Sequence, residues 1–166
     1  MIIRKSTKQD IEIIMEIYKY ARGFMAENKN PNQWGPTNWP PRELILEDIR
    51  LGNSYVCEEN NQIVGTFYYN YGEGIEPTYE VIEDGNWIAG NKYGVVHRIA
   101  TNGLGKGVGS FCLNWAYEQS GHLRIDTHPD NTIMQSLLSK LGFTKCGIIY
   151  VEEDDYPRFA YEKQGN

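Results

Sequence analysis

The chain has 166 residues, of which 40% are hydrophobic and 23% are charged, a composition typical of one globular domain over residues 1–166. Sixteen basic and 22 acidic residues give a formal net charge of −6, which argues against general nucleic-acid binding and is compatible with cationic substrates. No apolar run is long enough for a signal peptide or a membrane span, and the three cysteines and three histidines lack metal-ligand spacing. We therefore expect a reduced, cytoplasmic protein with no structural metal, no nucleic acid and no membrane partner.

The N-terminal third of the chain predicts one strand and two helices. Residues 2–5 form a short strand candidate, and a Thr-x-x-Asp capping box then opens a helix over residues 7–28 with apolar residues at helical spacing. Residues 29–41 are rich in Asn, Pro and Trp and predict an ordered loop. A second helix over residues 43–51 ends at the glycine that follows it.

The middle of the chain predicts a hairpin, a long connection and a strand. Residues 54–58 and 62–69 carry β-forming side chains on either side of an Asn-Asn turn. Residues 71–91 are polar, acidic and aromatic, and we expect a long connection with a helical turn near residues 79–82. Residues 93–101 predict the next strand.

The C-terminal third alternates helices and strands. A helix is expected over residues 107–119, a strand over residues 123–127, and a second helix capped by Asp130 or Asn131. Two further segments predict a closing hairpin, residues 147–151 and 158–162. The order of elements indicates a mixed α/β sheet with a glycine-rich turn near its middle.

This glycine-rich turn lies between the strand at residues 93–101 and the helix that begins at Gly107. Glycine lets a backbone approach a ligand closely, and the first N–H groups of a helix have no intrahelical partner, so the turn predicts a phosphate site. Two known phosphate motifs do not fit. A Walker A loop needs Ser or Thr after its Gly-Lys pair, where this chain has Gly107, and the dinucleotide fingerprint needs glycine where the chain has Val108 or Ser110.

A third pattern fits the turn. Residues 101–110 resemble the acyl-CoA loop of the GNAT family of N-acetyltransferases, which reads Gln/Arg-x-x-Gly-x-Gly/Ala. Gly107 and Gly109 occupy the two glycine positions, and Leu104 stands at the Gln/Arg position. Because the family binds pyrophosphate mainly through backbone N–H groups, this departure removes one polar side chain and leaves the backbone site.

A second segment carries the same resemblance. Family members commonly have an Asn, a Leu-Tyr pair whose Leu lies six residues after that Asn, and then Lys-x-Gly-Phe. This chain has Asn131, Leu137 and the run from Lys140 to Phe143 in that register. Leu138 stands at the Tyr position, which provides the proposed general acid in many members, and leucine cannot donate a proton. The run that begins at Asp126 is similar to that of a bacterial subgroup of the family.

The resemblance covers essentially the whole chain and implies a fold, a cosubstrate and a reaction. The implied fold is α/β (α+β), with a mixed, largely antiparallel sheet flanked by about four helices. The implied reaction is direct attack of an amine on acetyl-CoA in a ternary complex. The alternative is a non-catalytic acyl-CoA-binding module, motivated by Leu138, and a mononucleotide-binding enzyme is a second alternative. The acceptor stays open between a small molecule, an antibiotic, a polyamine and a peptide N-terminus, and a homodimer is compatible with the family.

The resemblance also implies the residues that bind acetyl-CoA. The strand at residues 93–101 would separate from its neighbour so that its backbone pairs with the pantetheine arm, and an N–H near Ile99 would face the thioester carbonyl. The amides of the turn would hold the pyrophosphate, Asn131 would contact the pantetheine arm, and two later residues would lie near the nucleotide. The implied set is Ile99, Ala100, Thr101, Leu104, Gly105, Lys106, Gly107, Val108, Gly109, Ser110, Asn131, Ser139 and Lys140.

His97 is the candidate general base, because the amine must lose a proton and a histidine titrates near neutral pH. Strand alternation places residues 93, 95, 97, 99 and 101 on one face, which would bring His97 beside Ile99. The alternative is a hydrogen-bonding histidine in the core. His128 and Tyr150 are candidate acids, although a structural role is favoured for each, and His128 would then orient the loop before Asn131.

The aromatic residues of the loops predict an acceptor site. Trp34, Tyr79 and Trp87 are the proposed substrate-binding residues, with Trp39 and Tyr93 as further candidates, because aromatic rings can stack on a ligand or hold a cation. Packing within a loop is the alternative for each of them. The acidic run at residues 152–155 could attract an amine, but we favour a solvated hairpin turn.

Overall fold

The computed structural model describes residues 1–165 and contains one seven-stranded sheet with helices on both faces. The strands are β1 (Ile2–Lys5), β2 (Ser54–Glu59), β3 (Gln62–Glu73), β4 (Lys92–Thr101), β5 (His122–Thr127), β6 (Thr144–Tyr150) and β7 (Pro157–Gln164). The helices are α1 (Ile11–Glu27), α2 (Arg42–Arg50), α3 (Val108–Ser120) and α4 (Thr132–Lys140), with short 3-10 turns η1 (Lys8–Asp10) and η2 (Pro77–Tyr79).

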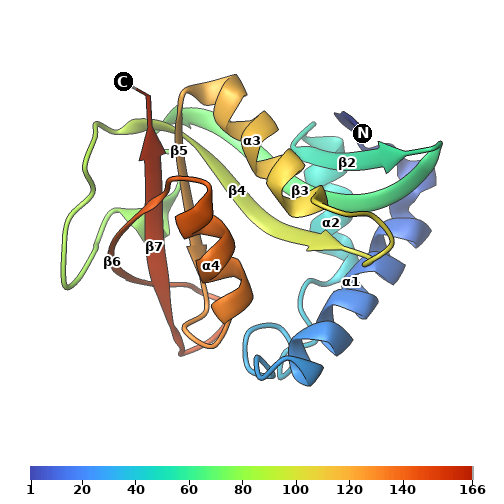
Figure 1. Cartoon of the computed structure of the whole chain (residues 1–166), viewed down its shortest axis with the longest axis horizontal. Helices are drawn as coiled ribbons and strands as arrows, with labels where there is room; N and C mark the ends of the chain where they lie inside the picture. Colours follow the sequence, from blue (N-terminus) through green and yellow to red (C-terminus); the bar gives the residue numbers. More distant parts are fainter. Residues whose placement is uncertain (166) are drawn as a thin grey trace.

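The strand order is β1-β2-β3-β4-β5-β7-β6, in which β4 and β5 run parallel and every other neighbouring pair runs antiparallel. Figure 1 shows α3 and α4 in front of this sheet and α2 behind it. The expected mixed, largely antiparallel sheet with four helices is confirmed.

Two apolar layers hold the helices to the sheet. On one face, Leu113 of α3 and Leu138 of α4 are fully buried together with sheet residues such as Phe67. On the other face, Ile14 and Tyr18 of α1 pack over β2 and β4. The burial of these apolar side chains is the main force that fixes the helices, at about 25 cal/mol per Å² removed from water.

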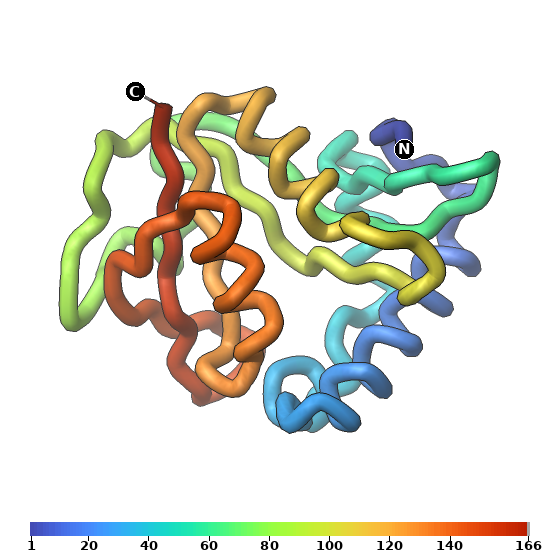
Figure 2. The backbone as a smooth tube through the Cα atoms, in the orientation of Figure 1, coloured from blue at the N-terminus to red at the C-terminus, as the bar shows by residue number. Residues whose placement is uncertain are grey.

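The two halves of the sheet separate along β4 and β5. These strands pair only at Gly94–Leu123 and Val95–Arg124, and they then diverge, as Figure 2 shows. Beyond Val95, the backbone of β4 therefore has no strand partner on the β5 side within residues 1–165. The separation that the resemblance implied is confirmed.

A β-bulge interrupts β4 at Arg98. His97 pairs with Tyr68 and Ala100 pairs with Thr66, so two residues of β4 lie opposite Phe67 alone. Arg98 has a φ of 52°, in the left-handed region that costs a non-glycine residue about 1–2 kcal/mol. The Tyr18 hydroxyl donates a hydrogen bond of 2.8 Å to the Arg98 carbonyl and supports this conformation.

The bulge corrects the expected alternation of β4. Val95 packs with the connection that follows β3, and His97 bonds to the same connection, as alternation predicts. Ile99 instead packs in the layer under α3 and α4, and Ala100 packs under α1. His97 and Ile99 therefore lie on opposite faces of the sheet, because the extra residue shifts the period of two by one position.

The connection between β3 and β4 contains the short helical turn η2, which lies about two residues earlier than predicted. The start is set locally, because Pro77 occupies the first position of the turn and the Glu76 carboxylate accepts a hydrogen bond from the Thr78 N–H. The rest of the connection lies beside β6, where Glu83 bridges to Ile148, as the light green tube in Figure 2 shows.

A buried carboxylate fixes this connection to the sheet. Glu162 of β7 is 1% exposed and accepts hydrogen bonds from the Arg124 Nε at 2.9 Å and from the Ile88 N–H at 2.6 Å, and it also bonds to His122. The Arg124 guanidinium lies 4.3 Å from the Trp87 ring centroid. Burial acts to raise the pKa of Glu162, but the bonds from His122, Ile88 and Arg124 outweigh it and lower the pKa.

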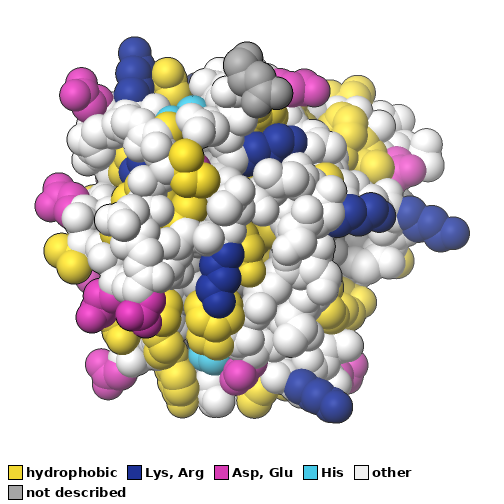
Figure 3. Space-filling view, turned by 60° about the vertical axis from the view of Figure 1, so that its left-hand side comes forward, with side chains coloured by type: hydrophobic (Ala, Val, Ile, Leu, Met, Phe, Trp, Pro, Cys, Tyr) yellow, Lys and Arg dark blue, Asp and Glu magenta, His cyan; other side chains and the backbone are white. Residues whose placement is uncertain are grey.

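The surface reflects the net charge of −6. On the face shown in Figure 3, Asp and Glu side chains gather along the left-hand side. Within residues 1–165, none of the helices combines the length and the hydrophobicity needed to cross a bilayer.

Replacing Glu162 by glutamine is expected to lower the free energy of unfolding at pH 7 by about 3 kcal/mol, because Arg124 would keep a buried charge without its carboxylate. The folded-state pKa of Glu162 is below its ordinary value of 4.5, so its contribution is present above that pH and is lost as the pH falls below it. Denaturant titrations at pH 7 and at successively lower pH should show the difference between the two proteins shrink. Glu118→Gln on the exposed face of α3 is the control, and an equal loss in both variants would contradict the prediction.

Candidate active site

Two hollows meet where β4 separates from β5. The polar pocket has a volume of about 250 Å³ and is lined by residues that include Trp34, Glu76, His97, Asp126, Thr127 and Glu153. The apolar cleft has a volume of about 260 Å³ and is lined by residues that include Phe24, Ala100, Thr101, Gly109, Ile133 and Leu137. The two share Met25, Ile99, Asn131 and Met134, so they adjoin at the separation of the strands.

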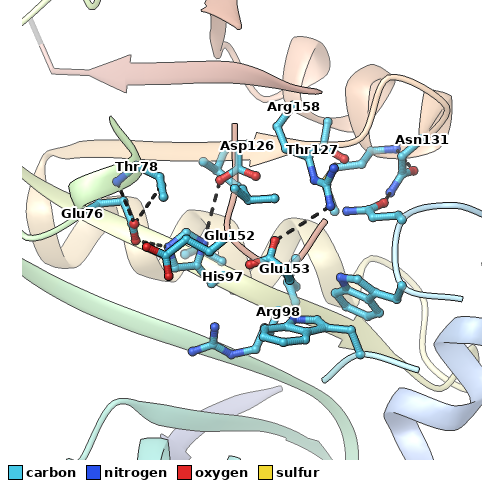
Figure 4. Close-up of a pocket in the computed structure, with 18 of the residues that line it drawn as sticks. Glu76, Thr78, His97, Arg98, Asp126, Thr127, Asn131, Glu152, Glu153 and Arg158 are labelled. Atoms are coloured by element: carbon cyan, nitrogen blue, oxygen red, sulfur yellow. Dashed lines mark hydrogen bonds and ion pairs between the residues drawn. The ribbon is translucent and has the colours of Figure 1, made fainter. Parts of the chain in front are cut away.

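His97 is oriented by a carboxylate of the β3–β4 connection. The distance from His97 Nε2 to Glu76 Oε2 is 2.5 Å, and the Thr78 hydroxyl donates to the other Glu76 oxygen at 2.8 Å (Figure 4). Burial acts to raise the pKa of Glu76, but the bonds from His97 and Thr78 outweigh it and lower the pKa. Because a carboxylate only accepts hydrogen bonds, a neutral His97 carries its proton on Nε2 and leaves the lone pair on Nδ1.

Asp126 lies on the other side of the His97 ring. His97 Nδ1 is 3.9 Å from Asp126 Oδ2, and the Tyr79 hydroxyl donates to the same oxygen at 2.6 Å. Burial and the charge of Asp126 raise the pKa of Tyr79 well above its ordinary value, so Tyr79 stays a neutral donor. The arrangement suits a proton acceptor, because Glu76 fixes the ring and the Nδ1 lone pair lies on the side of Asp126 and the pocket.

The proposed aromatic residues separate into two groups. Trp34 lines the polar pocket, and so does Trp39. Tyr79 is 2% exposed and lies behind Asp126, where it supports the site without lining the pocket. The structure places Trp87 away from the pocket, because its Nε1 donates to the Tyr79 carbonyl and its ring covers Arg124. The predicted contact of Tyr79 and Trp87 with a substrate is corrected accordingly.

The acidic run before β7 folds toward the pocket, which corrects the favoured solvated turn. Arg158 is 2% exposed and pairs with Asp154 at 2.7 Å and with Glu153 at 3.9 Å. This pairing bends the segment so that Glu152 and Glu153 line the polar pocket. Burial, together with the charge of Asp126, raises the pKa of Glu153 despite the nearby arginine.

Arg98 also lines the polar pocket, but its charge is satisfied elsewhere. Its guanidinium pairs with Asp48 of α2 at 2.8 Å and lies 4.7 Å from the ring centroid of Tyr68. Burial raises the pKa of Asp48, and the arginine offsets this only in part. The pair fixes the side chain of the bulge residue against α2.

The apolar cleft opens at the first turn of α3. Gly107 caps this helix with a φ of 69°, a conformation that favours glycine. A Cβ atom at Gly109 would lie 3.3 Å from Leu137 Cδ2, so any larger side chain would fill the cleft. The free N–H groups of this turn and the missing side chain of Gly109 fit a phosphate-bearing ligand with an apolar arm.

Some of the cofactor residues expected from the sequence line the apolar cleft, and others are exposed away from it. Those that line the apolar cleft are Ile99, Ala100, Thr101, Gly109 and Asn131. Leu104 is 76% exposed in the turn, and Ser139 and Lys140 are exposed at the far end of α4 from Asn131. Lys140 lies nine positions after Asn131 along α4, which is a distance of about 13 Å. Ser139 and Lys140 could therefore reach only a distant part of a long ligand.

The segment before α4 is held by its own side chains. The Asn131 carboxamide accepts a hydrogen bond of 3.0 Å from the Met134 N–H and donates one of 3.0 Å to Gln33. His128 Nδ1 accepts a hydrogen bond of 3.0 Å from the Asp130 N–H, and burial lowers the pKa of this histidine. The geometry bears out the structural role of His128 as the residue that orients this loop. Leu138 is fully buried in the apolar layer.

Sequence reasoning did not identify Glu76, Asp126 or Thr127 as site residues, and it considered Glu153 only as part of the acidic run for which a solvated turn was favoured. Glu76 had a local signal, because a Glu before Pro-Thr is a pattern of a capped turn. Asp126 and Thr127 are polar residues at the carboxyl end of β5, and the carboxyl end of a strand is a common place for binding residues. Glu153 had no signal that distinguished it from its acidic neighbours.

Comparisons with known proteins agree with this geometry. A family model described as the acetyltransferase (GNAT) family matches residues 17–143. A GNAT acetyltransferase structure from Streptococcus agalactiae is 30% identical, covers 99% of this chain and 95% of its own, and superposes with a TM-score of 0.88. No curated protein matches the chain.

Two more distant structures share the fold. A GNAT acetyltransferase from Listeria monocytogenes has 15% identity and a TM-score of 0.69, and covers 98% of this chain and 93% of its own. A ribosomal-protein-alanine N-acetyltransferase from Brucella melitensis has 18% identity and a TM-score of 0.65, and covers 99% of each chain. The family match, the 30% identical structure and the separated strands together show that this chain belongs to the GNAT acetyltransferase family.

Proposed function

We propose that this protein transfers the acetyl group of acetyl-CoA to an amine acceptor by direct attack in a ternary complex. The observation that carries the proposal is the junction at β4 and β5, where a polar pocket with an oriented histidine adjoins an apolar cleft at a helix N-terminus. Two substrates that enter from the two hollows would meet beside Ile99, and proximity of this kind supplies much of the rate of a bimolecular transfer.

The apolar cleft is the proposed site of acetyl-CoA. Residues 99–101 of β4 would bind the pantetheine arm, because this part of the strand has no partner on the β5 side. The backbone N–H groups from Gly105 to Ser110 would hold the pyrophosphate at the start of α3, with Asn131 beside the arm, whereas the expected Leu104 N–H already donates to Asn102 Oδ1 at 3.0 Å. Ser139 and Lys140 would contact the nucleotide end. Acetyl-CoA supplies the acetyl group as an activated thioester.

The polar pocket is the proposed site of the acceptor. His97 Nδ1 would take the proton from the ammonium group, and Glu76 would hold the ring and stabilise the imidazolium. The backbone N–H near Ile99 would polarise the thioester carbonyl. Leu138 offers no proton to the departing sulfur, and a thiol with a pKa near 8.5 can leave as a thiolate and take its proton from water.

A direct test is incubation with acetyl-CoA and a panel of primary amines, with free thiol as the readout. Amine-dependent release of thiol is the expected result. Tight binding of CoA in the absence of turnover with every amine would favour the non-catalytic acyl-CoA-binding module. Displacement of CoA by ATP in a thermal-shift competition would favour a mononucleotide site.

Replacing Gly109 by valine is expected to weaken the binding of CoA. The new side chain would occupy the part of the cleft beside Leu137 that the pantetheine arm needs, and a penalty of about 1–3 kcal/mol in binding corresponds to a loss of about 5- to 150-fold in affinity. Isothermal titration with CoA measures the change. Gly23→Val is the control, since it makes the same change within a helix and a Cβ at this glycine meets nothing within 4 Å. Equal affinities in the two variants would argue against the cleft as the CoA site.

Replacing His97 by asparagine is expected to lower kcat by about 10²- to 10⁴-fold, with the affinity for CoA unchanged, because the variant lacks a proton acceptor. Glu76→Gln should give a smaller loss in kcat and should shift the acidic limb of the pH–rate profile, because a neutral amide stabilises an imidazolium less well than a carboxylate does. Glu80→Gln, an exposed residue of the same connection, serves as the control. An unchanged rate and pH profile for the His97 variant would remove this residue from the mechanism.

A further inference from the structure

The polar pocket carries more negative charge than its own cations balance. Its lining includes the carboxylates of Glu76, Asp126, Glu152 and Glu153. Glu76 is bonded to His97, and Asp126 accepts a hydrogen bond from the neutral Tyr79 hydroxyl. Glu152 is an exposed residue of the lining, and within residues 1–165 its side chain makes no hydrogen bond or ion pair. The pocket therefore presents carboxylates that the folded protein leaves without a close cation.

The two arginines of the pocket do not supply that balance. Arg98 is paired with Asp48 at 2.8 Å, on the far side of the pocket wall in α2. Arg158 is paired with Asp154 at 2.7 Å through two hydrogen bonds, and it reaches Glu153 only at 3.9 Å. The closest carboxylate to each arginine is therefore a residue that does not line the pocket, and the arginines leave the carboxylates of the lining largely unneutralised.

A buried hydroxyl group in the polar pocket is a second indication of a ligand there. Thr127 is 1% exposed and lines the pocket, and its Oγ1 has no hydrogen-bond partner within residues 1–165. A buried hydroxyl without a partner is costly, so such a group in a binding pocket indicates a ligand that completes it. Oγ1 can accept a hydrogen bond from an ammonium group, which has three donors and no acceptor.

The size and the walls of the pocket suit a small cation. Its volume of about 250 Å³ is below the range of about 300–1,000 Å³ that drug-sized ligands occupy. Trp34 and Trp39 contribute aromatic surface to the wall, and the face of a tryptophan ring attracts an ammonium group.

We infer that the acceptor is a small dication, a primary amine with a second protonated nitrogen. The reacting nitrogen lies at His97, and the second nitrogen is held by Glu152 and Glu153, which line the pocket with Arg158 (Figure 4). The pairing of Arg158 with Asp154 folds this segment inward. This inference rests on the proposed acetyl transfer and adds the charge of the acceptor to it. Glu153 is accordingly a specificity-determining residue.

Three amines of similar length test the inference, 1,4-diaminobutane, 1-aminobutane and 4-aminobutanoate, each with acetyl-CoA and free thiol as the readout. They present the same reactive amine and differ in a terminal ammonium, methyl or carboxylate group. We expect kcat/KM for the diamine to exceed that for the monoamine by about 10- to 100-fold, the range of a hydrogen bond to a charged group. The preference should shrink as salt is added. Equal values, or a preference for the carboxylate, would overturn the inference and leave the acetyl transfer standing.

A matched set of variants locates the second charge. Glu153→Gln should raise KM for the diamine by about 10-fold or more with little change in kcat, and it should leave the monoamine unaffected. Asp155→Asn, an exposed residue of the same segment that does not line the pocket, is the control. The affinity for CoA and the melting temperature confirm that each variant is folded. An equal effect of both substitutions, or an effect on the monoamine as well, would overturn the role of Glu153.

Calorimetry of the CoA-bound protein with 1,4-diaminobutane separates this inference from the proposed function. Binding that depends on Glu153, combined with no thiol release when acetyl-CoA replaces CoA, would support the dication site and contradict the acetyl transfer. Absence of binding, or turnover of a peptide N-terminus in preference to the diamine, would overturn the dication site.

Discussion

The separation of β4 from β5 is the constraint on which the rest of the site depends. Two parallel strands that stayed paired would satisfy their backbone groups and close the sheet. Here the pairing ends at Val95, and both hollows adjoin along the gap that follows. The apolar layer under α3 and α4 contains side chains of both halves, such as Val96 and Ile125, so it fixes the two halves in this separated arrangement. A ligand can then use β4 as an edge strand inside the molecule.

The bulge at Arg98 converts this edge into a site with two different sides. Without the extra residue, Ile99 would lie on the same face as His97. With it, the His97 side chain lies toward the polar pocket and the Ile99 side chain packs on the opposite face, in the apolar layer under α3 and α4. The left-handed conformation of Arg98 is a local cost, and the Asp48 ion pair and the Tyr18 hydrogen bond offset it.

Carboxylates outside the pocket lining determine how much positive charge remains inside the pocket. Asp48 and Asp154 each bind an arginine of the pocket wall, so those arginines act as supports for the bulge and for the acidic segment. Glu162 has the same kind of role on the other side, because it fixes the connection that brings Glu76 to His97. Within the described residues, Asp126 and Glu152 line the pocket without a lysine or arginine partner, which favours a positively charged ligand there.

Local patterns in the sequence determined the positions of the strands and helices, the glycine-rich turn and the family, because periodicity, capping residues and motif spacing are properties of neighbouring residues. They also identified His97, Ile99 and Trp34, which lie at the two hollows. Only the tertiary structure brought Glu76 to His97 across 21 residues and folded Glu153 inward through Arg158. It also moved Ile99 to the opposite face from His97, since a bulge depends on the partner strand. These features rest on contacts between distant segments, and no local pattern records which distant residues will meet.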